Sequence, residues 1–363
     1  MDDKQHRAIQ EALMSKEVQK PSFYFSTGST IFDLVVGGGE TDGYGLGYEA
    51  GTIVRDWGNT SSSKTFKLSE CIAANHYKYK DNFKWIYDDT EFGNKFNSQA
   101  LYGFDIIPPD PAKQTHSRTV EDMFNNVYSF LDSLKGDDIG IYGVDSLDGL
   151  SSAEMEERKD ERRKAFAKGK EFNDGTYGGG APKFLSQEFF RGLASDLTKK
   201  NALLYIISQE RDNLNAGMYG KKIRLAGGKA ITFHETVRIY SKAKQIMEDK
   251  NIPIGVVVEI LAEKVRHPHP LRSCILPIYF EYGIDGIAAN IDFLYSLRTP
   301  TTGELKAKAA DNLTWDDEEF TRDDLVKHIE KNKLQNELAK RTIAKWDADY
   351  DAVKLNRATK YGM

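Results

Sequence analysis

Residues 58–65, with the sequence Gly-Asn-Thr-Ser-Ser-Ser-Lys-Thr, constrain the fold more than any other segment of the chain. A phosphate-binding loop has a Gly, four free positions and then Gly-Lys-Ser/Thr, and here Ser63 replaces the second Gly. A β-branched segment at 52–54 precedes the loop, and the apolar residues of 66–74 follow with helical spacing. A strand, a loop and a helix in this order let backbone N–H groups surround phosphates. The segment therefore predicts an α/β fold with a nucleotide site.

Two side chains of this loop have the chemistry that a nucleotide site needs. Lys64 is expected to reach the β- and γ-phosphates of ATP, and Thr65 is expected to hold Mg²⁺. The alternative is a serine-rich surface turn that binds nothing. The remaining loop residues are expected to contact the phosphates as well: Gly58, Asn59, Thr60, Ser61, Ser62 and Ser63.

Composition sets broad limits on the class of protein. A chain of 363 residues has room for one large α/β domain and a small appendage. No apolar run is long enough to span a bilayer, and from the polar residues at the N-terminus we expect no secretory signal. Cys71 and Cys274 are the two cysteines, which fits a reducing, cytoplasmic compartment and no metal cluster. With a net charge of −5, any binding of nucleic acid requires a local basic patch.

Strand-like runs alternate with helical stretches between residues 25 and 298, which predicts a doubly wound, mostly parallel twisted sheet. Several runs are almost continuously apolar, as strands buried on both faces are. A short helical arm of residues 1–24, expected to serve oligomerisation, precedes this core, and a small helical domain of residues 299–363 follows it. The expected strands are 52–55, 84–88, 139–145, 202–208, 236–241, 256–262 and 275–281.

Two long segments inside the core are expected to be loops. The first, residues 150–183, contains the charged run 156–164 and ends in a glycine-rich stretch. The second, residues 211–226, is polar and contains glycines and several cations. Loops of this length in a compact domain are usually functional or disordered.

Three further residues follow expected strands and could act on a bound nucleotide. Asp145 ends the apolar run 139–145 and is a candidate Mg²⁺ ligand. Glu91 follows the run 84–88 and could orient a water molecule for attack on the γ-phosphate. Gln209 follows the run 202–208 and opens the second loop, so it could couple the γ-phosphate to that loop. Each of the three could instead be an ordinary solvated residue.

Together, these residues resemble the RecA family of homologous-recombination ATPases, and most closely its phage UvsX-type branch. The resemblance runs in the family's order from about residue 25 to residue 298. UvsX-like proteins also lack the second glycine of the phosphate-binding loop, so Ser63 fits the resemblance. The matching motifs lie at 26–29, 32–34, 37–39, 89–93, 144–147, 227–230, 263–266 and 282–285.

The resemblance implies a DNA-dependent ATPase, requiring ATP and Mg²⁺, that forms filaments on single-stranded DNA and exchanges strands with a homologous duplex. Glu91 would be the catalytic carboxylate, and Asp145 would be the Walker B aspartate. Lys264 and Arg266 would reach the γ-phosphate held by the neighbouring protomer. Mediator and single-strand-binding proteins would be further partners, in a bacterial or phage-infected cell. The two long segments would be DNA-binding loops, with contacts from Arg211, Lys221, Lys222, Arg224, Gly227, Gly228 and Lys229.

Two other functions stay open at this point. A ring helicase shares this core and its chemistry, although such helicases carry a large N-terminal domain and this chain has a short arm. A weakly hydrolysing, recombinase-like accessory module would be consistent with the serine-rich loop. Imaging with single-stranded DNA would separate filament from ring, and an assay of phosphate release would test the accessory module.

Overall fold

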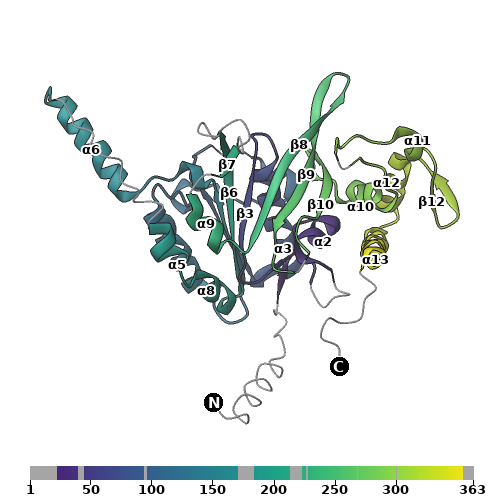
Figure 1. The fold of residues 1–363 in the computed structure, drawn as a ribbon, viewed down its shortest axis with the longest axis horizontal. Helices are drawn as coiled ribbons and strands as arrows, with labels where there is room; N and C mark the ends of the chain where they lie inside the picture. Colours follow the sequence, from purple (N-terminus) through teal and green to yellow (C-terminus); the bar gives the residue numbers. More distant parts are fainter. Residues whose placement is uncertain are drawn as a thin grey trace, which may run out of the picture.

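A computed structural model describes residues 23–39, 45–93, 96–170, 184–212, 223–225, 228–267, 269–299 and 301–354. It is a mixed α/β structure built around one large, curled sheet (Figure 1). Most of the arm predicted for residues 1–24 lies outside the described residues. No helix in the described ranges is both long enough and apolar enough to cross a membrane.

The centre of the sheet is parallel, and one side of it is antiparallel. Five strands, in the order β8-β3-β6-β5-β4, run in the same direction. Beyond β8 the sheet continues through β9, β10 and β11, each antiparallel to its neighbour. The predicted parallel α/β core is therefore confirmed, with an antiparallel extension. The strands are β3 (Ile53–Gly58), β4 (Phe83–Asp89), β5 (Ile139–Asp145), β6 (Ala202–Asp212), β8 (Val237–Asp249), β9 (Ile252–Lys264), β10 (Ser273–Tyr279) and β11 (Gly283–Ile284).

Successive residues of a strand point to opposite sides of the sheet, so apolar strands leave apolar side chains on both of its faces. Helices cover both faces and bury these side chains. Leu203 and Tyr205 of β6 pack into the cluster formed with helices α2 (Thr30–Gly37) and α3 (Lys64–Tyr79). Leu204 and Ile206 pack into a second cluster on the other face. That second face is covered by α5 (Val120–Ser133), α8 (Leu193–Lys199) and α9 (Gly228–His234) (Figure 1).

Several short elements connect these layers. A two-stranded sheet pairs β1 (Tyr24–Phe25) with β2 (Tyr48–Glu49). The strand β7 (Ile223–Leu225) pairs with the end of β6, so the loop predicted for residues 211–226 is wrong at 211–212 and 223–225, which form strands. The remaining short helices and turns of the core are α4 (Ser98–Tyr102), Lys80–Asn82, Pro111–Lys113, Leu147–Gly149 and Leu185–Phe189.

The first predicted loop is wrong over much of its length, because residues Ala153–Ala167 form the helix α6. Ser152 caps this helix by accepting a hydrogen bond from the backbone N–H of Met155 at 3.3 Å. The segment contains no Gly or Pro and is rich in Ala, Glu, Arg and Lys, which are strong helix formers. The glycine-rich part at 171–183 lies outside the described residues.

The residues predicted as a C-terminal domain pack around Trp315, Leu325 and Leu338, together with Ile291 and Leu297 from the end of the core. The segment is mostly helical, but it includes a β-hairpin. Its two longest helices are separated near Lys333, where φ is 55°, and Thr321 caps the first of them by accepting from the N–H of Asp324. Helix α10 (Gly286–Leu294) ends the core, and the elements beyond it are α11 (Ala307–Ala310), β12 (Leu313–Trp315), β13 (Glu318–Phe320), α12 (Arg322–Lys331) and α13 (Gln335–Val353).

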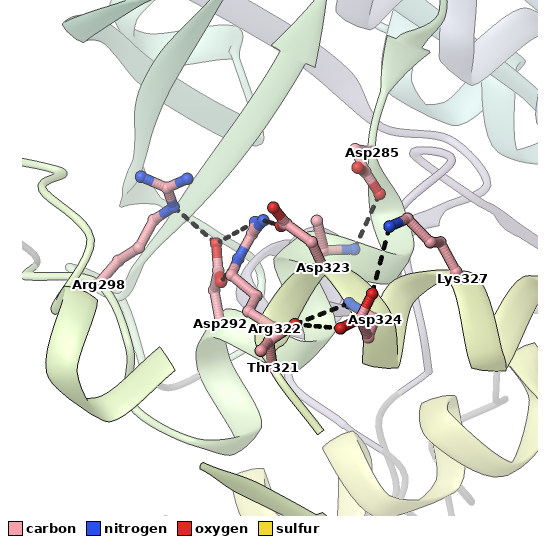
Figure 2. A network of polar contacts seen from close by, with 9 residues as sticks. Asp285, Asp292, Arg298, Thr321, Arg322, Asp323, Asp324 and Lys327 are labelled. Carbon is pink, nitrogen blue, oxygen red and sulfur yellow. Dashed lines mark hydrogen bonds and ion pairs between the residues drawn. The ribbon is translucent and has the colours of Figure 1, made fainter. Parts of the chain in front are cut away.

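A buried ionic junction fixes α12 to the core (Figure 2). Asp292 of α10 accepts from Arg298 Nε at 2.6 Å, and from Arg322 Nε at 2.5 Å and Nη2 at 3.0 Å. All three side chains are almost fully buried. Burial lowers the pKa of Arg322, but the hydrogen bonds and charge of Asp292 outweigh it and hold that pKa above its ordinary value.

Candidate nucleotide site

The phosphate-binding loop lies between β3 and α3, as the sequence predicts. Gly58 ends the strand with φ 154°, and a Cβ there would lie 2.0 Å from the carbonyl oxygen of Ser241, so only glycine fits. Ser63, which stands where the motif has its second glycine, is left-handed, with φ 56° and ψ 33°. The position therefore needs the conformation that glycine adopts most easily, and serine adopts it at a cost of roughly 1–2 kcal/mol.

Lys64 is folded back over the loop that precedes it. Its ammonium group donates to the carbonyl oxygens of Gly58 at 3.0 Å and Asn59 at 2.7 Å, and to the Ser62 hydroxyl at 3.2 Å. The side chain is buried, and burial lowers the pKa of Lys64, although the nearby charges of Asp56 and Asp145 oppose the shift. The ammonium group is thus held at the place where the loop would receive phosphates.

The structure brings together the two residues predicted to hold Mg²⁺. Thr65 donates to Asp145 Oδ2 at 2.8 Å, and Tyr87 donates to the same oxygen at 2.6 Å. Burial raises the pKa of Asp145, and these two hydrogen bonds counteract part of that shift. Mg²⁺ is commonly held by one or two carboxylates together with waters and phosphate oxygens, so a hydroxyl beside one carboxylate fits this ion. The described residues contain no cluster of three or more His, Cys, Asp or Glu side chains that could hold a metal without other ligands.

Glu91 and Gln209 also meet at this edge of the sheet. Gln209 Nε2 donates to Glu91 Oε1 at 3.1 Å, and the Ser146 hydroxyl donates to the same oxygen. The strands β4, β5 and β6 are parallel, so Glu91, which follows β4, meets Gln209, which lies near the end of β6, at one edge of the sheet. Sequence reasoning identified Glu91 and Gln209 but missed Ser146, although its position directly after the strand 139–145 was the signal.

Asp148 is a second residue that sequence reasoning missed. It accepts from the backbone N–H of Gln209 at 2.7 Å, and from Arg211 Nη2 at 2.9 Å and Nε at 3.1 Å. This carboxylate therefore joins the residue predicted to sense the γ-phosphate to the first residue predicted to bind DNA. Arg211 stays largely exposed.

A buried ion pair joins the two elements that flank the loop at 58–65, namely β3 and α3. Lys67 Nζ lies 2.6 Å from Asp56 Oδ2, and both side chains are fully buried. The hydroxyls of Tyr205 and Ser241 donate to the same carboxylate at 2.8 Å and 2.7 Å. Burial lowers the pKa of Lys67, while the Asp56 charge and hydrogen bond oppose this. The pair fixes α3 to the strand that carries Gly58, and nothing in the local sequence pattern indicated it.

Lys264 and Arg266 lie at the opposite edge of the sheet from the loop. The strand β9 runs antiparallel to β8, and Lys264 is paired with Arg238 near the start of β8. Lys264 Nζ donates to the carbonyl oxygens of Glu235 at 2.6 Å and Thr232 at 3.2 Å.

Arg266 Nη2 donates to the carbonyl oxygen of Gly51 at 2.7 Å, and its Nη1 lies 3.4 Å from Glu49 Oε1. Neither side chain therefore joins the nucleotide site of its own chain. Both cations are held within their own protomer, Lys264 against the backbone at the end of α9 and Arg266 against Gly51 and Glu49.

The residues predicted to contact DNA are only partly within the described structure. Arg224 is paired with Arg211 in the β6–β7 hairpin. Gly228 and Lys229 begin α9. Lys221, Lys222 and Gly227 lie outside the described residues.

The sequence of this chain is similar to those of several known proteins. No model of a known protein family matches the chain. The protein RecA of Malacoplasma penetrans (strain HF-2) is 24% identical over 268 residues, which are 74% of this chain and 72% of that protein. RecA of Mycoplasma genitalium (strain ATCC 33530 / DSM 19775 / NCTC 10195 / G37) is 25% identical over 260 residues, 71% of this chain and 67% of that protein.

RecA of Thermus aquaticus is 28% identical over 142 residues, 36% of this chain and 42% of that protein. These similarities support a relationship to the RecA family of recombinases, and with it the RecA-like core. They do not bear on the resemblance to the UvsX-type branch.

Proposed function

We propose, from the premise of a relationship to the RecA family, that this chain is an ATP-dependent DNA recombinase. In this proposal it hydrolyses ATP, assembles on single-stranded DNA and pairs that strand with a homologous duplex. The observation that carries the proposal is the convergence of Lys64, Thr65, Asp145, Glu91 and Gln209 at one edge of the sheet. The motifs at 89–93 and 263–266 favour the phage UvsX-type branch within the family.

The residues of the loop would bind and orient the triphosphate. Lys64 would exchange the carbonyl oxygens of Gly58 and Asn59 for oxygens of the β- and γ-phosphates, which are stronger acceptors for an ammonium group. Thr65 and Asp145 would hold Mg²⁺, which when bound offsets the negative charge of the phosphates.

Glu91 would act on the chemical step. Its Oε1 is fixed by donors from Gln209 and Ser146, so a water molecule can be oriented by the other carboxylate oxygen. Gln209 would change partner when a γ-phosphate is present. Since Asp148 ties the Gln209 backbone to Arg211, that change would be transmitted to the segment that carries the candidate DNA contacts.

Assembly would complete the site. Lys264 and Arg266 cannot reach the nucleotide of their own chain from the opposite edge of the sheet, so they would serve the site of a neighbouring protomer. A basic residue supplied in this way acts like an arginine finger, and hydrolysis would then depend on filament formation.

Phosphate release, measured with and without single-stranded DNA, tests this function. We expect DNA to stimulate hydrolysis by the native chain and Lys64→Ala to lower the rate by on the order of 100-fold or more, because charge aimed at the phosphates is lost. Lys78→Ala, an exposed change near the other end of α3, is the matched control and should hydrolyse normally.

Absence of DNA-stimulated hydrolysis in the native chain would favour the weakly hydrolysing accessory module. Normal hydrolysis by Lys64→Ala would contradict the assignment of the loop. Electron microscopy with a non-hydrolysable ATP analogue and single-stranded DNA should show open filaments, whereas closed rings would favour the helicase.

A further inference from the structure

The helix α6 extends away from the body of the molecule (Figure 1). None of its residues is buried. Its base is fixed, because the backbone N–H of Ala153 donates to Glu121 Oε2 at 3.0 Å and the Ser151 hydroxyl donates to Glu156 Oε1 at 2.5 Å. The nucleotide site described above uses no residue of this helix.

One face of α6 is basic and ends in apolar side chains. Its residues follow the spacing i, i+3, i+4, i+7, i+8 and i+11, which places them on one side of a helix. Met155 and Phe166, at the two ends of this face, are 41% and 86% exposed, although both are large and apolar. The basic face consists of Met155, Arg158, Lys159, Arg162, Arg163 and Phe166.

The other side of α6 is mainly acidic. Glu154, Glu157, Asp160 and Glu161 form this acidic face, while Lys164 follows toward the C-terminal end. The helix carries as many carboxylates as cations, so it has no net charge. Its positive and negative side chains nevertheless lie on different sides.

This separation does not favour the helix in isolation. Arg158 and Arg162, and likewise Glu157 and Glu161, place like charges four residues apart, which destabilises an isolated helix. Opposite charges within the helix pair at Glu154–Arg158, 3.6 Å apart, and at Glu156–Lys159. A helix of 15 residues that buries no side chain is only marginally stable in water. A partner that contacts both faces would account for the pattern.

We propose that α6 is a contact between copies of this chain, in which the basic face of one copy lies against the acidic face of α6 on the next. A second copy matches both faces at once. A nucleic acid matches only the basic face. If it bound there, the carboxylates of the acidic face would lie within one helix diameter, about 10–12 Å, of its negatively charged backbone. That distance is close to the Debye length of about 8 Å at physiological salt, so the repulsion would be felt.

The contact joins two different surfaces, so it is heterologous and repeats from copy to copy. It therefore deepens the filament assembly of the proposed function and rests on that assembly for its repetition. Exposed ion pairs contribute little each and are screened by salt, so the α6 contact adds to an assembly that other surfaces also hold, and it weakens at high salt.

Disulfide cross-linking of the full chain tests the proposal. Lys159→Cys places a thiol on the basic face, and Glu161→Cys places one on the acidic side; the native Cys71 and Cys274 are buried and do not compete. A mixture of the two variants should give several-fold more cross-linked dimer than either variant alone, and 0.5 M salt should abolish the excess. Equal yields in the mixture and in the two single preparations would overturn the proposal.

Charge reversal adds a complementation test. The acidic-face variant Glu157→Lys/Asp160→Lys/Glu161→Lys and the basic-face variant Arg158→Glu/Arg162→Glu/Arg163→Glu should each lose the excess of cross-links. When each is combined with a suitable cysteine, the mixture of the two variants should regain it. Lys113→Glu/Lys199→Glu, which changes exposed cations elsewhere, is the matched control and should change nothing.

The same samples separate the other outcomes. Cross-linking is measured with and without single-stranded DNA and an ATP analogue, and phosphate release is measured in parallel. If reversal changes only the affinity for DNA and leaves cross-linking alone, α6 binds nucleic acid and the proposal is wrong. If the cross-linking pattern holds in protein that shows no DNA-stimulated hydrolysis, the α6 contact stands and the proposed function fails.

Discussion

At the scale of single residues, Ser63 shows how a departure from a motif can preserve its geometry. The sequence marks this serine as a mismatch, whereas the structure shows the left-handed backbone that the motif's glycine would adopt. The residues predicted from strand ends converge because parallel strands share one carboxyl edge. The buried Asp56–Lys67 pair was not predictable in this way, since its members face each other only after the helix has packed on the sheet.

Glu91 offers the sharpest test of chemistry at one residue. Glu91→Gln keeps the shape of the side chain but removes the charge that, in the proposed function, would orient a water molecule. We expect hydrolysis to fall by roughly 10²- to 10⁴-fold while ATP binding is nearly unchanged, because affinity rests on the loop and Mg²⁺. Single-turnover hydrolysis and nucleotide titration measure the two effects separately. A variant that loses affinity but keeps its rate would contradict the role of Glu91.

Glu70 is expected to make stability depend on pH. Burial raises its pKa to about 7, although hydrogen bonds from Tyr102 and the Ile284 backbone oppose the shift. A carboxyl whose pKa is higher in the folded state binds its proton more tightly there, so its contribution to stability is present below pH 4.5 and is lost as the pH rises through about 7. A shift of this size corresponds to about 3 kcal/mol.

Glu70→Gln should remove this dependence. Urea unfolding at pH 5 and pH 8 measures it: the free energy of unfolding of the native chain should fall more between these two values than that of the variant. Glu154→Gln, an exposed change on α6, should behave like the native chain. Parallel pH profiles for the native chain and Glu70→Gln would show that Glu70 does not contribute.

At the scale of elements, the strands were predictable and α6 was not. The runs 139–145 and 202–208 are apolar on both faces because helices cover both sides of the sheet, and this pattern is visible in the sequence. The helix α6 buries no side chain and has no apolar stripe, so hydrophobic periodicity could not reveal it. Its capping serine and its strong helix formers were the available signals.

The junction between α10 and α12 gives a prediction at this scale. Asp292→Ala would leave Arg298 and Arg322 buried without their shared carboxylate (Figure 2). Removing one partner of a buried ionic group typically costs about 3–5 kcal/mol, so we expect early unfolding of the elements beyond α10. Hydrogen exchange of α12 and α13 measures this loss. Asp323→Ala, which removes an exposed carboxylate paired with Arg322, should have little effect. Equal effects of the two changes would contradict the role of Asp292 in holding α12 to the core.

At the scale of the whole molecule, the candidate nucleotide site and the pair Lys264 and Arg266 lie at opposite edges of one sheet. In the proposed function, a protomer with this arrangement would bind a nucleotide at one edge and complete a neighbour's site with the other. The contact of Lys264 with the carbonyl oxygens at the end of α9 would have to open when the ammonium group turns to a neighbour's phosphate.

A mixing experiment tests this arrangement. Lys264→Ala should bind nucleotide normally but hydrolyse it poorly, because its own loop is intact and the basic group it gives to its neighbour is missing. Lys64→Ala has the opposite defect. Mixed filaments of the two inactive variants should recover part of the activity at junctions where an intact loop faces an intact Lys264.

Phosphate release is measured at fixed total protein over a series of mixing ratios, with a maximum expected near equal amounts. Lys242→Ala, which removes an exposed cation of β8 on the same hairpin, is the control that should hydrolyse normally by itself. If the mixture stays inactive while fluorescence energy transfer between labelled variants shows that they share filaments, Lys264 does not act on a neighbour's nucleotide.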